Sequence, residues 1–141
     1  MGVKKKMKLI VCVDDHCGMM FNHRRQSRDA KVRENMLQMT GEQKLFVSPY
    51  TAGQFTQAEQ ERLHCSELFL EEAGEDDYCF VEDAMHLERV TNIKEIVVYY
   101  WNRSYPADCH FTMELPEEVT ECAECFAGTS HPEIWKRVYR V

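Results

Sequence analysis

KLIVCV, residues 8–13, is the stretch that decides the fold class of this chain. It is a nearly continuous run of apolar and β-branched residues, as expected for a strand buried on both faces of a parallel sheet. Similar runs occur at residues 44–48 (KLFVS), 78–81 (YCFV) and 94–101 (KEIVVYYW). Because segments of helical character separate these short runs, their order predicts an α/β domain.

Helical patterns lie between the predicted strands. Residues 14–25 are polar and contain a glycine, so we predict a loop there. Ser27 is the predicted N-cap of the next helix, with Asp29 in its first turn, and Gly41 ends that helix. Further helical segments are predicted at residues 51–65, at 66–74 with Ser66 as the cap, and at 84–90.

The hydrophobic period changes after Pro106. Residues 109–115 alternate like an antiparallel strand, a turn surrounds Gly128, and residues 134–141 (IWKRVYRV) alternate again. We therefore expect a single α/β domain over residues 1–141. Its sheet should be mixed and mainly parallel, flanked by helices, with an antiparallel C-terminal strand pair. The predicted core contains Leu9, Val11, Val13, Leu45, Val47, Phe80, Val81, Ile96 and Val98.

Composition limits the class of protein. The 141 residues are 44% hydrophobic and 29% charged, which supports a real core and argues against disorder. No run approaches the roughly 18 apolar residues of a membrane helix, and residues 9–13 are too short for a signal-peptide core. We expect a soluble, cytoplasmic protein without a membrane partner. Composition leaves its oligomeric state open.

The seven cysteines do not suggest a disulfide framework. An odd count without a secretion signal is typical of reduced thiols. Cys122 and Cys125 form a lone CxxC, whereas a structural zinc site needs four ligands. Cys109, His110 and His131 offer further donors, so metal binding at this motif stays open.

The net charge of −7 is unevenly distributed. Residues 1–34 carry nine basic and four acidic side chains, a charge of +5, whereas residues 35–141 carry eight and twenty, a charge of −12. The basic excess is concentrated in Arg24, Arg25, Arg28, Lys31 and Arg33. Such a patch favours an anionic ligand through its local positive potential. The acidic remainder would repel a nucleic-acid backbone, so nucleic acid is not the favoured partner.

Acidic residues follow two of the predicted strands. Asp14 and Asp15 come after the first strand, and Glu82 and Asp83 come after residues 78–81. The carboxyl ends of parallel strands share one edge of a sheet, and carboxylates suit Mg²⁺. One alternative function is therefore a Mg²⁺-dependent phosphoryl-transfer or nucleic-acid-cleaving hydrolase with these four acids as metal ligands. The other interpretation is that these acids form turns and helix caps, where Asp and Glu are common.

Three segments together resemble dihydrofolate reductase. Residues 9–36 (LIVCVDDHCGMMFNHRRQSRDAKVRENM) resemble that family's first strand, its substrate loop and the helix with its folate-binding carboxylate. Residues 45–55 (LFVSPYTAGQF) resemble its second strand and following helix, and residues 79–111 resemble the segment from its cofactor strand to its antiparallel ribbon. The resemblance implies that family's fold. It also implies that Asp29 takes the carboxylate position and Thr51 a phosphate-contacting position.

The chain departs from the family pattern at the cofactor site. The family's Pro-Trp before the substrate helix is replaced by residues 24–25 (RR), and the basic residue before Thr51 is replaced by Tyr50. The family's glycine-rich turn after the cofactor strand is replaced by residues 82–84 (EDA). Helix N-termini normally attract the phosphates of a dinucleotide. Two carboxylates at this helix N-terminus would instead repel those phosphates. We therefore expect neither NADPH as cofactor nor dihydrofolate reductase activity.

These observations predict a domain that binds a small-molecule or nucleotide-like ligand, with catalysis undefined. Asp29 is the candidate catalytic residue and would hold a cationic or amidine-like edge of the ligand in a cleft. Arg25, Tyr50 and Thr51 are the candidate ligand-binding residues, with Arg25 pairing with a carboxylate or phosphate. The sign of the Asp29 pKa shift depends on whether burial or the nearby positive charge dominates.

A further alternative is a receiver-like regulatory domain. LIVCVDD followed by a helix resembles the opening of a response-regulator receiver, in which paired acids bind Mg²⁺ and a third Asp accepts phosphate. Asp83 lies near the expected position of that acceptor.

Overall fold

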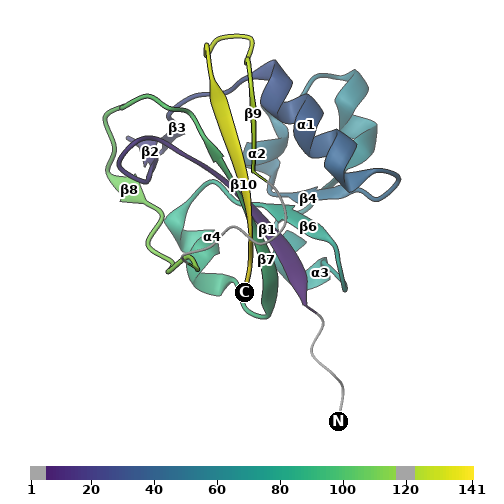
Figure 1. The fold of residues 1–141 in the computed structure, drawn as a ribbon. Helices are drawn as coiled ribbons and strands as arrows, with labels where there is room; N and C mark the ends of the chain where they lie inside the picture. Colours follow the sequence, from purple (N-terminus) through teal and green to yellow (C-terminus); the bar gives the residue numbers. More distant parts are fainter. Residues whose placement is uncertain (1–5, 117–122) are drawn as a thin grey trace.

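The computed structural model describes residues 6–116 and 123–141 (Figure 1). The strands of its main sheet are β1 (Met7–Val13), β4 (Leu45–Val47), β5 (Leu63–Cys65), β6 (Tyr78–Phe80), β7 (Ile93–Tyr100), β9 (Ala123–Phe126) and β10 (Ile134–Arg140). A small second sheet contains β2 (Gly18–Phe21), β3 (Arg24–Arg25) and β8 (Cys109–His110). The helices are α1 (Ala30–Thr40), α2 (Pro49–Ala52), the 3₁₀ helix η1 (Ala58–Arg62), α3 (Phe69–Glu72) and α4 (Ala84–Arg89).

The main sheet is mixed and mostly parallel, as predicted. Its strand order is β5-β4-β6-β1-β7-β10-β9. β1 lies at the centre and pairs in parallel with β6 and β7, and β4 pairs in parallel with β5 and β6. β10 is antiparallel to both β7 and β9. The strands near residues 8–13, 78–81 and 94–101 are therefore neighbours in one sheet.

Both faces of the main sheet are covered, which explains why its central strands are apolar throughout. Ile10 of β1 packs in one cluster with residues of α1 and α2. Leu9 and Val11 point to the opposite face and pack in a second cluster with residues of α3, α4 and β2. All nine residues predicted for the core are buried, with exposed fractions of at most 2%. In the part of the chain that the structure describes, no helix is long and apolar enough to cross a membrane.

The N-terminus of α1 differs from the prediction. Asp29, not Ser27, is the N-cap: its backbone is extended, and its side chain accepts a hydrogen bond from the backbone N–H of Lys31. Asp29 is thus just outside the first turn, and the Ser27 hydroxyl is hydrogen-bonded to His131 instead. The predicted end of the helix is confirmed, because Gly41 caps it with a φ of 61°.

The loop predicted at residues 14–25 is wrong in part, because β2 and β3 form a two-residue hairpin there. Its turn residues Asn22 and His23 have φ of 53° and 61°. Positive φ at both turn positions is the backbone of a type I′ turn, whose twist suits a tight hairpin. His23 stands where glycine is usual, so the sequence carried only a weak turn signal.

Three other segments also differ from the prediction. The antiparallel strand predicted at residues 109–115 is limited to β8, which pairs with β2 in the small sheet rather than within the main sheet. Residues 51–65, predicted as helical, end in strand β5. The predicted cap Ser66 accepts a hydrogen bond from the Leu68 N–H, and Leu68 is the N-cap residue of α3.

Candidate functional site

The connection from β3 to α1 carries the polar residues of the candidate site. Arg25, Ser27 and Asp29 all line a cavity of about 10 Å³, a size that suits about one water molecule. Other residues of the sheets and helices complete its wall: Cys12, Met19, Val32, Met36, Gln54, Phe80, Glu82 and Trp101. The cavity therefore lies between two polar clusters, one around Asp29 and one around Glu82.

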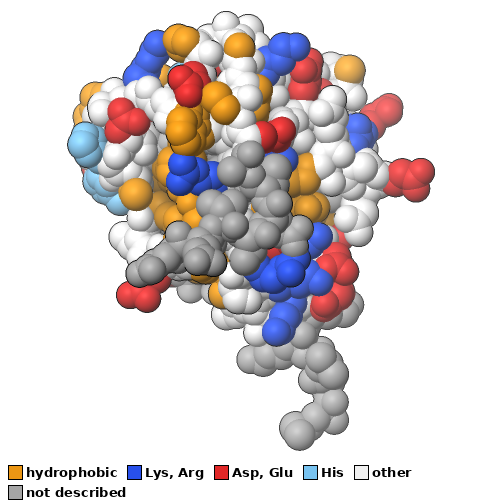
Figure 2. Space-filling view, viewed as in Figure 1, with side chains coloured by type: hydrophobic (Ala, Val, Ile, Leu, Met, Phe, Trp, Pro, Cys, Tyr) orange, Lys and Arg blue, Asp and Glu red, His pale blue; other side chains and the backbone are white. Residues whose placement is uncertain are grey.

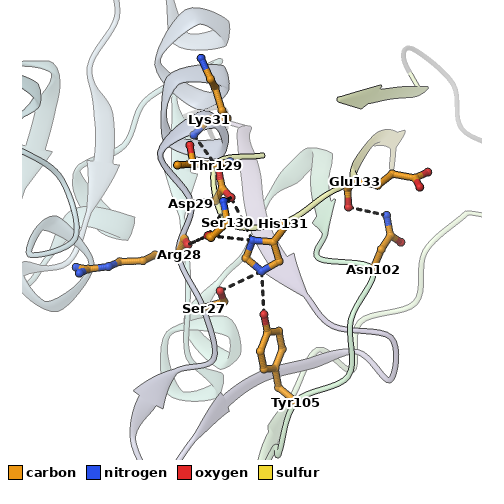
Figure 3. Close-up of polar contacts among 10 residues, drawn as sticks. All are labelled: Ser27, Arg28, Asp29, Lys31, Asn102, Tyr105, Thr129, Ser130, His131 and Glu133. Carbon is orange, nitrogen blue, oxygen red and sulfur yellow. Dashed lines mark hydrogen bonds and ion pairs between the residues drawn. The ribbon is translucent and has the colours of Figure 1, made fainter. Parts of the chain in front are cut away.

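Asp29 has its carboxylate fully occupied by protein donors. Oδ1 accepts hydrogen bonds from the backbone N–H groups of Lys31 and Thr129, both at 2.9 Å. Oδ2 accepts from the Ser130 N–H at 2.8 Å, the Ser130 hydroxyl at 3.2 Å and His131 Nδ1 at 3.1 Å (Figure 3). The contact with Lys31 caps α1, and the other four join the start of α1 to the connection between β9 and β10.

The hydrogen bonds decide the sign of the Asp29 pKa shift. Burial alone would raise this pKa, but the donors from Thr129, Ser130, His131 and Lys31 lower it well below the usual value. Asp29 is therefore ionised at neutral pH. Protein donors thus occupy the carboxylate that was predicted to hold a cationic edge of a ligand.

His131 links Asp29 to two hydroxyl groups. Its ring is buried and stacks on Trp101, with ring centroids 4.6 Å apart. Nε2 lies 3.1 Å from Ser27 Oγ and 2.8 Å from the Tyr105 hydroxyl oxygen (Figure 3). Because the ionised Asp29 accepts at Nδ1, a neutral His131 carries its hydrogen on Nδ1 and leaves Nε2 as an acceptor.

Sequence reasoning considered His131 only as a zinc donor. It lies 102 positions from Asp29, and no periodic pattern leads from one residue to the other. Only the return of β10 beside β7 brings this turn against α1, so the sequence carried no signal for the contact.

The second cluster contains the predicted residues Arg25 and Tyr50. Arg25 Nε lies 3.0 Å from Glu82 Oε2, and Nη2 lies 3.2 Å from Oε1, which makes a two-pronged ion pair. The guanidinium also lies 4.3 Å from the centre of the Tyr50 ring and donates to the Tyr50 carbonyl. The Tyr50 hydroxyl in turn accepts from the Arg25 N–H at 2.8 Å.

Burial of Glu82 makes its ion pair with Arg25 necessary. Burial raises the pKa of Glu82, and hydrogen bonds from Arg25 and Thr51 offset only part of this effect. Thr51 is buried in α2, where its backbone N–H donates to Ser48 Oγ, the cap of that helix. The structure thus brings Arg25, Tyr50 and Thr51 together around Glu82, and Asp29 shares the cavity wall with Arg25 and Glu82.

An open hollow lies beside these clusters. It has a volume of about 410 Å³ and is lined by Arg24, Arg25, Ser27, Arg28 and Tyr50. Arg25 is neutralised by Glu82, but Arg24 and Arg28 are exposed and form no ion pair with any described residue. Figure 3 shows the Arg28 side chain extending away from the Asp29 network. The hollow therefore presents two free positive charges.

A second, larger groove adjoins the hollow at Tyr50, which lines both. The groove has a volume of about 600 Å³ and a largely apolar wall. Its lining residues are Met20, His23, Tyr50, Asp83, Ala84, Met85, Asp108 and Cys109.

The acidic residues of the alternative metal site are not gathered around one point. Asp14 is buried, and its Oδ1 accepts from the N–H groups of His16 and Gly18 at 2.8 and 2.7 Å. Its Oδ2 accepts from Gln26 Nε2 and the Tyr105 N–H at 3.0 and 3.1 Å. Burial would raise the pKa of Asp14, but these hydrogen bonds lower it. Asp14 therefore holds the surrounding loops in place.

The other three acids also have partners of their own. Asp15 is exposed and accepts from the Ser104 hydroxyl, and Glu82 is paired with Arg25. Asp83 caps α4 by accepting from the His86 N–H at 2.7 Å. Over residues 6–116 and 123–141, no group of three or more metal-binding side chains is arranged to hold an ion. The strand-end acids thus form turns, a cap and an ion pair.

The CxxC motif lies partly outside the described residues. Cys122 belongs to the segment that the structure does not describe, whereas Cys125 of β9 is exposed and donates to Glu133 Oε1 at 3.3 Å.

Comparison of the sequence with protein-family models and with curated proteins finds no match.

Proposed function

We propose that this protein binds a small molecule that carries a phosphate or carboxylate group, and that the anion binds in the hollow between Arg24 and Arg28. The observation that carries this proposal is the pair of guanidinium groups without an acidic partner among the described residues. Planar guanidinium groups match the geometry of carboxylate and phosphate oxygens. Arg25 contributes mainly by fixing Tyr50 at the edge of the hollow.

The neighbouring groove supports a nucleotide-like ligand. Tyr50 lines both the hollow and the groove, so one ligand could reach both from a single position. Met85 exposes 68% of its surface and Tyr50 exposes 42%, which leaves apolar area available for a ring system. A ligand with an anionic end and an apolar ring fits this arrangement.

The charge distribution favours a small ligand over a nucleic acid. The arginines of the hollow lie within residues 24–28, and residues 35–141 carry a net charge of −12. Figure 2 shows basic and acidic side chains interspersed over the visible face that carries β10. Nucleic-acid binding depends on many phosphate contacts over an extended basic surface.

We also propose that the fold of this protein is similar to that of dihydrofolate reductase. The mixed sheet with a central β1 and an antiparallel C-terminal pair supports it. The residues at the start of α4 do not fit NADPH, because the Asp83 carboxylate already accepts the His86 N–H there. A negative side chain at a helix N-terminus opposes the binding of a pyrophosphate.

The proposal can be tested by calorimetric titration with AMP, inorganic phosphate and adenosine at low ionic strength. We expect AMP to bind, phosphate to bind more weakly and adenosine to bind weakest, with AMP affinity falling as salt is added. The double variant Arg24→Gln/Arg28→Gln should lose at least tenfold in AMP affinity. Arg103→Gln changes an exposed arginine outside the hollow and should leave the affinity unchanged. Equal binding by the double variant, or no binding of either anion, would overturn the proposal.

A further inference from the structure

We propose that Ser27 is a nucleophile activated by His131 and Asp29, and that the protein hydrolyses carboxylic esters bearing an anionic group. The substrate class rests on the anion site proposed above. The reactivity of Ser27 is argued independently, from its contact with His131 and the contact of His131 with Asp29. Neither the resemblance to a reductase nor the ligand-binding function requires this activity.

The three side chains form a continuous hydroxyl–imidazole–carboxylate chain. Ser27 Oγ lies 3.1 Å from His131 Nε2, and His131 Nδ1 lies 3.1 Å from Asp29 Oδ2 (Figure 3). Both distances are within hydrogen-bond reach, and the two imidazole nitrogens contact different partners. This is the arrangement by which a carboxylate orients a histidine that takes a proton from serine, and it recurs on unrelated folds.

The surroundings hold the imidazole in the required tautomer. His131 has an exposed fraction of 2% and stacks on the buried Trp101, so its ring cannot turn freely. Asp29 is fixed by backbone N–H groups of Thr129 and Ser130 and is ionised at neutral pH. An ionised carboxylate beside Nδ1 keeps the hydrogen on that atom and stabilises the imidazolium that forms when Nε2 accepts a proton.

Ser27 is the member of this chain that a substrate can reach. It is half-buried and lines both the small cavity and the open hollow, whereas His131 and Asp29 are buried behind it. The free guanidinium groups of Arg24 and Arg28 line the same hollow. They can hold an anionic group of the substrate and offer donors to the oxyanion that forms during attack.

The reaction balances with water as the second reactant. Ser27 Oγ attacks the ester carbonyl carbon while its proton passes to His131 Nε2, and the tetrahedral intermediate then expels the alcohol, which takes that proton. A water molecule next attacks the acyl-serine and gives a proton to Nε2. Collapse of the second intermediate releases the carboxylic acid and returns the proton to Ser27.

A Tyr105 variant can distinguish an activated Ser27 nucleophile from a hydrogen-bond network that only stabilises the fold. The Tyr105 hydroxyl lies 2.8 Å from His131 Nε2, closer than Ser27 Oγ, and so competes for the same acceptor. Tyr105→Phe removes the competing donor and leaves Nε2 free for Ser27. The proposal therefore expects faster reaction at Ser27 in this variant, whereas a network that served only stability would give no reaction in either protein.

The test is treatment of the full chain with a fluorophosphonate probe at pH 8, followed by intact mass and peptide mapping. We expect one adduct on Ser27, no adduct in Ser27→Ala, and faster labelling in Tyr105→Phe. Ser104→Ala removes an exposed serine outside the hollow and should label like the parent. Asp29→Asn should label at least a hundredfold more slowly, compared at a temperature where thermal melting shows it folded.

Substrate class is then tested by release of p-nitrophenol from two p-nitrophenyl esters, the acetate and the hemisuccinate. We expect Ser27-dependent turnover of both, with the anionic hemisuccinate favoured at least tenfold and that preference lost in Arg24→Gln/Arg28→Gln. Labelling that persists in Ser27→Ala, or a folded parent that does not label, would overturn the assignment of Ser27 as the nucleophile. Labelling at Ser27 without a preference for the anionic ester would leave the nucleophile standing and contradict the proposed anion site.

Discussion

His131 Nδ1 lies 3.1 Å from Asp29 Oδ2, although 102 positions separate the two residues in the sequence. Both side chains are buried, with exposed fractions of 2% and 3%. Their contact joins the connection between β9 and β10 to the N-terminus of α1. The Asp29 carboxylate therefore serves as a helix cap and as the centre of a long-range hydrogen-bond network.

Replacement of Asp29 by Asn should destabilise the protein by about 2–3 kcal/mol at neutral pH, because hydrogen bonds to a charged acceptor are lost. The pKa of Asp29 is lowered in the folded state, so the stability that its charge supplies is present above the unfolded pKa and lost as the pH falls. The difference between parent and variant should therefore shrink below about pH 4. Urea unfolding between pH 3 and pH 7 measures this change.

Asp15→Asn is the matched control for that experiment, since Asp15 is exposed and accepts one side-chain hydrogen bond, from Ser104. It should change the free energy of unfolding by less than about 0.5 kcal/mol. An Asp29→Asn variant as stable as the parent at pH 7 would show that the carboxylate is not held as described.

Replacement of Gly128 by Ala should disrupt the same network from the opposite side. A Cβ atom on Gly128 would come within 2.5 Å of Asp29 Oδ2, and the five donors on that carboxylate prevent it from moving away. We expect a loss of about 1–3 kcal/mol in stability, as for other overpacked buried sites. Thermal unfolding measures the loss, and the NMR signals of the His131 ring should shift.

Gly41→Ala provides the comparison. Gly41 has a φ of 61° and nothing within 4 Å of the position of an added Cβ, so alanine there costs backbone strain of about 1–3 kcal/mol without contacting Asp29. The His131 ring signals should stay in place in that variant. Unchanged His131 signals in Gly128→Ala would contradict the close approach to Asp29.

Replacement of Arg25 by Gln should cost about 3 kcal/mol, because it leaves the buried Glu82 carboxylate without its cation. The double variant Arg25→Gln/Glu82→Gln should recover part of this loss. Urea unfolding of the two single variants, the double variant and the parent gives the coupling energy between the two residues.

The folding stability of the Arg25→Gln variant should depend on pH, and the direction of the change follows from the pKa of Glu82. Burial already raises the pKa of Glu82, and removal of Arg25 should raise it further. The folded state then binds a proton more tightly than the unfolded state does, so stability should decrease as the pH rises from 5 to 8. A variant that became more stable over this interval would show that Glu82 is not the group responsible.

The sheet could be predicted from the sequence because each central strand is buried on both faces. Leu9 and Ile10 lie on opposite faces of β1 yet are both fully buried, so the apolar run itself identified the strand. The small sheet was missed, because β2 and β3 are short, at four and two residues, and turn at His23 rather than at a glycine.

The candidate site could be predicted only where its residues are close in sequence or fixed by the strand ends. The sequence placed Arg25 and Tyr50 in one site, and the structure brings them into contact. It could not assign Glu82 to Arg25 or His131 to Asp29, because each pair depends on how distant segments pack. The sequence also could not distinguish acids that bind Mg²⁺ from acids that serve as helix caps or ion-pair partners, as Asp83 and Glu82 do.

An NMR titration of the arginine Nε–Hε signals with AMP tests whether an anion binds between Arg24 and Arg28. We expect saturable shifts of the Arg24 and Arg28 signals at a common dissociation constant, with little change at Arg103, which lies outside the hollow. Adenosine should not shift the two signals to the same extent. Saturable AMP binding that leaves the Arg24 and Arg28 signals unmoved would contradict the claim.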